Sequence, residues 1–301
     1  MPADLALRGL QLRARGITAG YGADPVIRDM TVSVAPGQVV SLVGPNGSGK
    51  STLLKSLVGI VHVASGTVLV GDRDVTNQPP EEIARAGVGY VPQVDDVFGP
   101  LSVRENLEMG GYLLRKPQVA EHIERVLAVF PRLAGMLGRT AGKLSGGERK
   151  MLAMGRVLML DPGVFLLDEP TANLAPAVAA ELLDEHVRQL ASGGAAVLIV
   201  EQRARAVLAI SDYTYVLGGG RVLMEGTPAR LAASQEFTES FFGAVPKAPK
   251  LSGAPGEHGG HELASAAHAK LVERRGQVLL DGVGRDVQGL DDLAGGVSPD
   301  D

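Results

Sequence analysis

A glycine-rich segment placed directly after an apolar run constrains the fold of this chain more than any other feature. It reads Gly44-Pro45-Asn46-Gly47-Ser48-Gly49-Lys50-Ser51-Thr52, follows the apolar run 39–43, and leads into leucines at helical spacing. A strand, a tight loop and a helix N-terminus in this order let successive backbone N–H groups converge on phosphate oxygens. Within the loop, Lys50 is placed to reach the β- and γ-phosphates, and the Ser51 hydroxyl to ligate Mg²⁺. The segment therefore predicts a nucleotide-binding site made of these residues.

An acidic pair follows a second apolar run much later in the chain. The run 164–167 ends in Asp168 and Glu169. At a strand end, Asp168 can hold Mg²⁺ through water, while Glu169 beside it can polarise an attacking water. Such a pair is common by itself, but together with the phosphate loop it predicts nucleotide hydrolysis.

A third segment, Leu144-Ser145-Gly146-Gly147-Glu148, opens a helical pattern shortly before the acidic strand. A serine and two glycines at a helix start form an anion site, able to bind a γ-phosphate through backbone N–H groups. One nucleotide on a phosphate loop needs no second such site from the same chain. The segment therefore favours a site completed by another chain, although a plain N-cap would also suit these residues.

The remaining pattern predicts an α/β fold with an antiparallel layer and a parallel core sheet. Continuous apolar runs are typical of parallel strands that are buried on both faces, and alternating ones of antiparallel strands. We expect strands at 12–18, 30–34, 39–43, 68–70, 88–91, 164–167, 196–200, 213–217 and 221–224, and helices after the phosphate loop, at 178–190 and from 228. A helical subdomain is expected over about 94–158, within a domain spanning 10–243. Residues 244–301 have a linker composition, and we expect them to be largely disordered.

Charge and composition exclude several other classes of protein. With 29 basic and 34 acidic residues, the chain has no basic excess that would hold nucleic acid. It has no cysteine, and thus no disulfide or thiolate metal site. No apolar run approaches the roughly 20 residues of a membrane helix, and the N-terminus has no signal-peptide pattern, so we expect a cytoplasmic location. His62, His122 and His186 have no metal-ligand partners at a recognisable spacing, and the histidines after residue 250 suit a solvated tail.

The order of phosphate loop, Gln93, Leu144–Glu148 segment and acidic pair resembles the ATP-binding subunits of ABC transporters over about residues 10–243. The resemblance implies the P-loop NTPase fold of ABC ATPases. It also implies that Tyr21 stacks on adenine and that Gln93 touches Mg²⁺ and reports the nucleotide to a membrane partner. Two such subunits would sandwich two ATP molecules, with each phosphate loop facing the other chain's Ser145.

A finer resemblance is to the second ATPase of the branched-chain amino acid importers, a group that includes urea and amide uptake systems. It is carried by Glu105–Leu107, Met109–Tyr112, Phe130–Leu133, Thr171–Pro176 and Val200–Gln202. Two positions depart from the general family pattern. The segment after Pro170 lacks its usual aspartate, and Gln202 stands where most members have a histidine. Glutamine can bond the γ-phosphate but cannot gain a proton near neutral pH, so Glu169 would act as the base without a titrating partner.

The resemblance implies a subunit that works with separate transmembrane permease subunits, and indirectly with a solute-binding protein, on the inner face of the membrane. The alternative is a soluble ABC ATPase of translation or DNA repair. It is disfavoured because the chain has one phosphate loop and no long coiled-coil insertion. A binder without hydrolysis is disfavoured because Lys50, Asp168 and Glu169 are all present. The solute, the choice between homodimer and heterodimer, and the role of the tail stay open.

Overall fold

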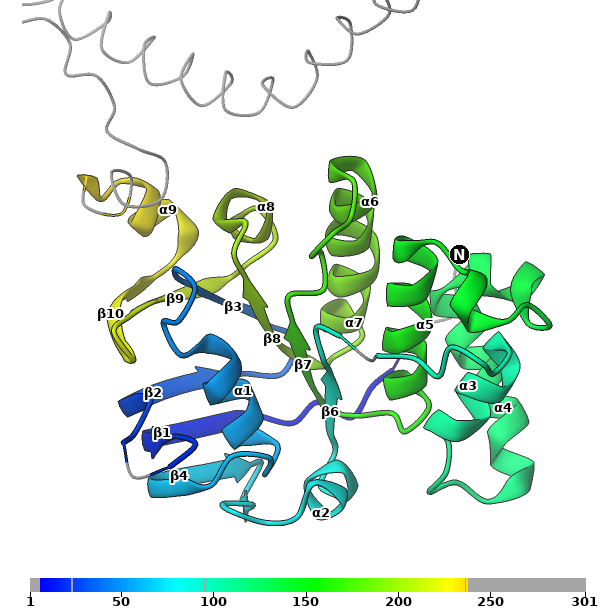
Figure 1. Ribbon diagram of the computed structural model, residues 1–301, viewed down its shortest axis with the longest axis horizontal. Coiled ribbons are helices and arrows are strands. Elements are labelled where there is room, and N and C mark those ends of the chain that lie inside the picture. The colour runs from blue at the N-terminus through cyan, green and yellow to red at the C-terminus, as the bar shows by residue number, and fades with distance from the viewer. Residues whose placement is uncertain (1–5, 23, 95, 236, 238–301) are drawn as a thin grey trace, which may run out of the picture. The chain divides into compact units, whose positions relative to one another are not determined.

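The computed structural model describes residues 6–22, 24–94, 96–235 and 237. The expectation for 244–301 lies outside these residues. The described chain forms a four-stranded sheet of order β2-β1-β4-β5 and a six-stranded sheet of order β10-β9-β3-β8-β7-β6 (Figure 1).

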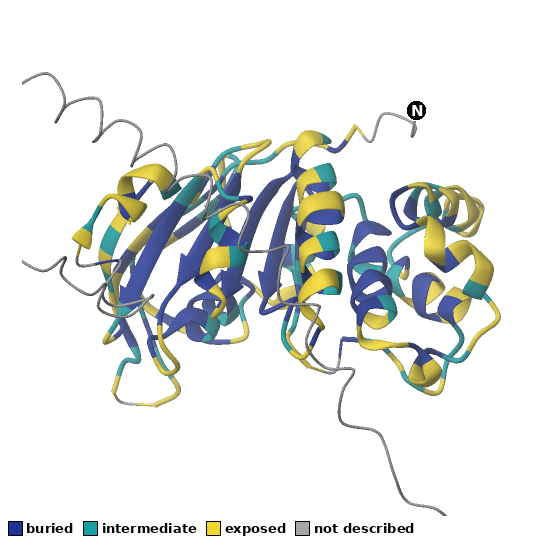
Figure 2. Cartoon of the chain, turned by 90° about the horizontal axis from the view of Figure 1, so that it is seen from above, coloured by how far each residue is buried: buried dark blue, intermediate teal, exposed yellow. Residues whose placement is uncertain are grey.

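Five parallel strands and one antiparallel edge strand make the larger sheet. The parallel strands are β3 (Val39–Val43), β6 (Val88–Val91), β7 (Val164–Asp168), β8 (Ala196–Glu201) and β9 (Tyr213–Gly218), and β10 (Arg221–Gly226) pairs antiparallel with β9. Every residue of β3, β7 and β8 is buried, as the continuous apolar runs of β7 and β8 predict. Figure 2 shows these strands as the dark interior, with exposed residues on the outer faces of the helices.

The smaller sheet is antiparallel and consists of β1 (Leu12–Ala19), β2 (Ile27–Val34), β4 (Val63–Val70) and β5 (Arg73–Asp74). Helix α1 (Lys50–Leu57) buries Leu53, Leu54 and Leu57 in one cluster with apolar side chains of this sheet and of one face of the larger sheet. The start of α1, where the phosphate loop ends, is thus held by both sheets.

A group of helices lies beyond β6, at the right of Figure 1. It contains α3 (Val103–Gly110), α4 (Lys116–Val129) and α5 (Gly146–Leu158), with the 3₁₀ turns η1 (Pro131–Met136) and η2 (Ala141–Lys143). Helices α3 and α5 pack closely: a Cβ at Gly110 would lie 2.3 Å from the carbonyl oxygen of Arg156. Ser102 and Ser145 begin α3 and α5 with capping boxes.

The other helices are α2 (Pro80–Arg85), α6 (Pro176–Glu181), α7 (Arg188–Ser192), α8 (Ala204–Leu208) and α9 (Pro228–Ala232). The helix expected over 178–190 is interrupted by a π-helical segment, η3 (Leu182–Val187), between α6 and α7. None of the helices among the described residues has the length and apolar character needed to span a bilayer.

Candidate functional site

Four neighbouring parallel strands deliver candidate residues to one edge of the larger sheet. The strands lie in the order β3-β8-β7-β6. Lys50 follows β3, Gln202 follows β8, Glu169 follows β7 and Gln93 follows β6. The carboxyl ends of parallel strands form a common edge, which is the usual ligand site of such sheets. Residues that are far apart in the sequence therefore meet in one place.

The phosphate loop requires glycine at several positions. Gly47 and Gly49 have φ angles of 78° and 97°, in the left-handed region that side chains disfavour. A Cβ at Gly44 would lie 2.4 Å from the carbonyl oxygen of Leu217. Gly49 is the N-cap of α1 and has no side chain to occupy the space at the helix start. The loop and the start of α1 are therefore shaped by backbone, and no side chain at Gly47 or Gly49 would hinder a phosphate that approached the N–H groups there.

Two side chains of the loop fit a phosphate group. Lys50 is 5% exposed, and its Nζ donates to the carbonyl oxygens of Gly44 at 2.8 Å and Pro45 at 3.0 Å. Burial lowers the pKa of its ammonium group, and the charges of acidic neighbours oppose that shift. The buried Ser48 hydroxyl has no hydrogen-bond partner within the described residues. A cation and an unpaired hydroxyl at one loop suit an anionic ligand. Thr52, the last predicted loop residue, is buried in α1.

The predicted metal ligands Ser51 and Asp168 lie next to each other. The Ser51 hydroxyl donates to Oδ1 of Asp168 at 3.1 Å, and the Tyr90 hydroxyl donates to Oδ2 at 3.3 Å. Burial raises the pKa of Asp168, and the hydrogen bond from Ser51 opposes this. A hydroxyl and a carboxylate are oxygen ligands that Mg²⁺ prefers, so the residues present fit this ion.

Glu169 is the point on which two amide side chains converge. Nε2 of Gln93 donates to its Oε2 at 2.8 Å, and Nε2 of Gln202 lies 2.8 and 2.9 Å from its two oxygens. Glu169 has a φ angle of 47°, which turns the chain sharply after β7. Both donors are neutral amides, so the hydrogen bonds that orient the carboxylate come from uncharged groups. The third predicted metal ligand, Gln93, thus contacts Glu169 through its nitrogen.

Sequence reasoning assigned no role to Glu201, the last residue of β8. Glu201 is 2% exposed and accepts hydrogen bonds from the Thr171 amide at 2.9 Å and the Thr171 hydroxyl at 2.8 Å. Burial raises the pKa of its carboxyl group. These bonds fix the chain after Glu169 against the end of β8, which Gln202 follows. The sequence signal that could have indicated Glu201 is a charged residue at the end of an otherwise apolar strand.

The Leu144–Glu148 segment has the geometry of a helix start. The Ser145 backbone N–H donates to Oε2 of Glu148 at 2.7 Å, and this bond keeps the pKa of Glu148 low. Side chains at the two glycines would collide with the segment after the acidic pair. A Cβ at Gly146 would lie 2.9 Å from Cδ2 of Leu174, and one at Gly147 would lie 2.5 Å from Cγ1 of Val178. In the part of the chain that is described, no hydrogen bond or ion pair joins this segment to the phosphate loop.

Two further features lie outside this edge. Tyr21 comes just after β1 and is 66% exposed, so its ring is open to a stacking partner.

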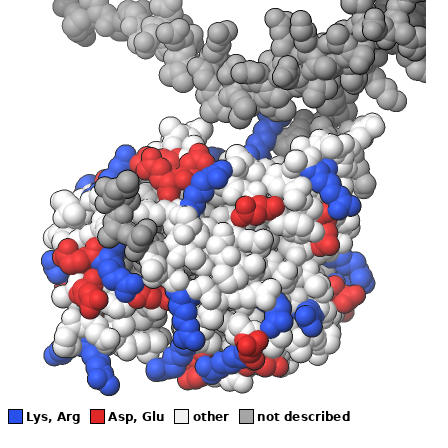
Figure 3. Space-filling model, turned by 180° about the vertical axis from the view of Figure 1, so that it is seen from behind, with Lys and Arg blue, Asp and Glu red and all other residues white. Residues whose placement is uncertain are grey.

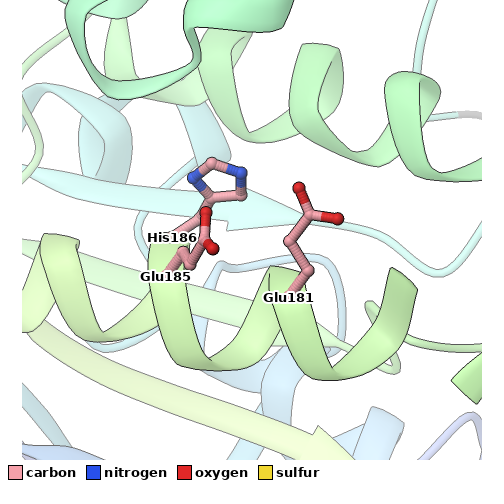
Figure 4. A group of neighbouring side chains, drawn as sticks. All are labelled: Glu181, Glu185 and His186. Atoms are coloured by element: carbon pink, nitrogen blue, oxygen red, sulfur yellow. The ribbon is translucent and has the colours of Figure 1, made fainter. Parts of the chain in front are cut away.

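The second feature is a cluster of two carboxylates and an imidazole along α6 and η3 (Figure 4). Ligand atoms of Glu181, Glu185 and His186 lie within 4.8 Å of one another, a proximity that the sequence spacing did not indicate. Arg132 already pairs with Glu181 at 2.9 Å. On the face drawn in Figure 3, basic and acidic side chains are interspersed.

Comparison with known proteins gives one consistent result. The family model described as ABC transporter matches residues 27–172. A probable branched-chain amino acid transport ATP-binding protein LivF of Archaeoglobus fulgidus is 39% identical, over 78% of this chain and 99% of its own. The high-affinity branched-chain amino acid transport ATP-binding protein BraG of Pseudomonas aeruginosa is 38% identical, over 75% and 97%. A solved nucleotide-free ATP-binding cassette from an ABC transporter superposes with a TM-score of 0.68 at 28% identity, over 82% of this chain and 100% of its own.

Proposed function

The chain belongs to the ABC transporter family as an ATP-hydrolysing subunit, and we propose that it powers the import of branched-chain amino acids or of a related small polar solute such as urea or an amide. The named relatives are branched-chain amino acid transport proteins, which supports the first of these solutes. The convergence of Gln93 and Gln202 on Glu169, beside the phosphate loop, carries the proposal for hydrolysis.

ATP would lie with its phosphates on the loop and its adenine against Tyr21. Lys50, now bonded to loop carbonyls, would turn its charge to the β- and γ-phosphates. Ser51, Asp168 and the Gln93 amide oxygen would hold Mg²⁺. That ion, when bound, supplies neutralising charge at the phosphate oxygens.

Glu169 is the proposed general base. Its carboxylate is close enough to Lys50 for its charge to act on the ammonium group. It would accept the proton of a water as the water oxygen attacks the γ-phosphorus and the bond to the leaving ADP oxygen breaks. The Gln202 amide orients the carboxylate in the structure and can bond the γ-phosphate oxygen. Because an amide does not titrate near neutral pH, the step depends on Glu169 alone for proton transfer.

We propose that a second ATPase subunit, either this chain again or a related one, completes the site with its own Ser145 loop. The helix start at Ser145 offers backbone N–H groups and a positive dipole end to a γ-phosphate. Among the described residues, no hydrogen bond or ion pair joins this helix start to the phosphate loop of the same chain. A site to which each subunit contributes one part fits two nucleotides held between two subunits.

Replacing Ser145 with arginine tests the two-subunit site. The long cation would fill the space that the opposite γ-phosphate must enter, so we expect ATP turnover to fall at least 100-fold. Binding of a fluorescent ATP analogue to the separate subunit should change less than about twofold. Arg149→Ala, at an exposed position on the same helix, is the control. Normal turnover by Ser145→Arg would exclude a role for this loop at the γ-phosphate.

The permease subunits are expected to dock beside Gln93. An apolar groove there is bounded by α2, β6, α3 and α5, with Ile60, Met109 and Tyr112 exposed along it. Asp96, just after Gln93, also lines the groove. A permease segment seated in it would touch the chain that carries Gln93, which explains how nucleotide binding could reach the membrane. The protein would thereby be held at the cytoplasmic face of the membrane.

Uptake of labelled solutes tests the transport function. In cells that lack this chain, we expect uptake of leucine, or of urea or an amide, to fall to background. A wild-type copy should restore it, and a Glu169→Gln copy should not, because transport requires hydrolysis. If none of these solutes loses uptake, the proposed solute class is wrong.

A further inference from the structure

A buried lysine on the helix that begins at Ser145 bonds to the backbone of Gln93. Lys150 of α5 has its side chain 8% exposed, and its Nζ donates to the carbonyl oxygen of Gln93 at 2.8 Å. The same Nζ lies 2.7 Å from Oδ2 of Asp96, whose side chain is 6% exposed. One cation therefore binds two points of the segment that follows β6.

A second set of contacts fastens the same segment further along α5. The Arg156 guanidinium donates to the carbonyl oxygen of Asp96 and lies 4.4 Å from the centroid of the Phe98 ring. The fully buried Asn106 of α3 accepts from the Phe98 amide at 2.8 Å and donates to the Phe98 carbonyl at 3.0 Å. Gln93, Asp96 and Phe98 are thus each bonded to α5 or α3.

The two ends of this connection carry different candidate functions. At one end, the Gln93 side chain donates to Glu169, beside the phosphate loop. At the other, the N-cap of α5, Ser145, comes five residues before Lys150, which is about 8 Å along a helix. Lys150 therefore links the Gln93 backbone directly to the helix whose start is proposed to serve a second subunit.

The chemistry of the contact argues for a positioning role. Burying a lysine and an aspartate costs desolvation energy, and an apolar pair of similar volume would often stabilise a fold as well. What a hydrogen-bonded ion pair adds is a fixed geometry between its partners. The carbonyl of Gln93 is included in that geometry, so a shift of the Gln93 backbone must be matched by α5 or break the bond.

We infer that Lys150 is a positioning residue that makes the Gln93 segment and α5 move as one unit. Engagement of Gln93 at one nucleotide then sets the orientation of the Ser145 loop that serves the nucleotide of the other subunit. This inference rests on the proposed function of Gln93, Glu169 and Ser145. It adds a residue to which neither the sequence motifs nor the named relatives assign a role.

Lys150→Met tests this inference, since methionine keeps much of the length and removes the charge and both bonds. We expect kcat for ATP to fall about tenfold, because small misplacement of a reacting group is costly, while the Kd of a fluorescent ATP analogue stays within about twofold. Asp96→Asn should lower kcat less. The double variant should fall no further than Lys150→Met, because both changes act through one contact.

Two reference variants separate this role from a general loss of stability and from failure of the proposed function. Val126→Ala creates a cavity in the same group of helices, where Val126 is fully buried; it should lower the melting temperature by a comparable amount and leave kcat within about twofold. Glu169→Gln should abolish turnover. If Glu169→Gln is inactive but Lys150→Met keeps wild-type kcat, or if Val126→Ala loses as much kcat, the inference about Lys150 is overturned. If Glu169→Gln retains turnover, the proposed function itself fails.

Discussion

Replacing Lys50 with alanine should weaken ATP binding about 100-fold. Lys50 is 5% exposed, its ammonium donates to loop carbonyls, and the charges of the acidic residues at the ends of β7 and β8 act on it. Charge-assisted hydrogen bonds in such a place contribute about 1.5–3 kcal/mol, and 1.4 kcal/mol corresponds to tenfold in affinity. Removal of the charge also leaves the carboxylates near the phosphates without their counter-charge, which adds to the loss.

A titration with a fluorescent ATP analogue measures this effect on the separate subunit. Lys55→Ala is the matched control, because Lys55 lies in the same helix, α1, and has no hydrogen bond to the phosphate loop among the described residues. We expect the control to bind within about twofold of the wild type. Unchanged affinity in Lys50→Ala would contradict the assignment of this loop to ATP phosphates.

Much of the fold could be predicted because the deciding signals are local. The continuous apolar runs of β7 and β8 correctly predicted buried parallel strands. The hairpin of β9 and β10 followed from the glycines at 218–220. Three short elements were not predicted: β5 has two residues, α2 has six and α8 has five, too few to show a period. The π-helical turn of η3 also has no local signal, since its residues would suit an ordinary helix.

The candidate site could also be predicted only in part. The phosphate loop and the acidic pair are contiguous motifs, and their chemistry follows from the spacing alone. The family resemblance assigned Gln93 to Mg²⁺ and Gln202 to the γ-phosphate. It did not indicate that both amides bond to Glu169, because the three residues follow different strands. The roles of Glu201 and Lys150 depend on pairing between distant segments. No pattern within either segment indicates its partner.

Glu169→Gln should reduce ATP turnover about 1000-fold and leave ATP binding intact. The glutamine keeps the size of the side chain and a hydrogen-bonding oxygen but cannot take a proton from the attacking water. General-base catalysis typically contributes 10²–10⁴-fold, which sets the expected scale. The neutral amide at Gln202 cannot replace the lost base, so no neighbouring group among those bonded to Glu169 restores the reaction.

Glu181→Gln is a matched control for the loss of one carboxylate. Glu181 lies on α6, where it pairs with Arg132 and has no contact with the phosphate loop among the described residues. Turnover in this variant should stay within about twofold of the wild type. An equal loss in both variants would point to a general effect of charge rather than to proton transfer at Glu169.

The composition of the bound nucleotide tests the central claim most directly. Wild-type protein and the Glu169→Gln variant are each incubated with Mg²⁺ and labelled ATP, separated from free nucleotide, and the bound ATP and ADP are measured. We predict that the wild type yields ADP within the incubation, while the variant retains almost only ATP at a similar amount of bound nucleotide. If the variant yields ADP as fast as the wild type, Glu169 is not the base and the account of hydrolysis at this site is wrong.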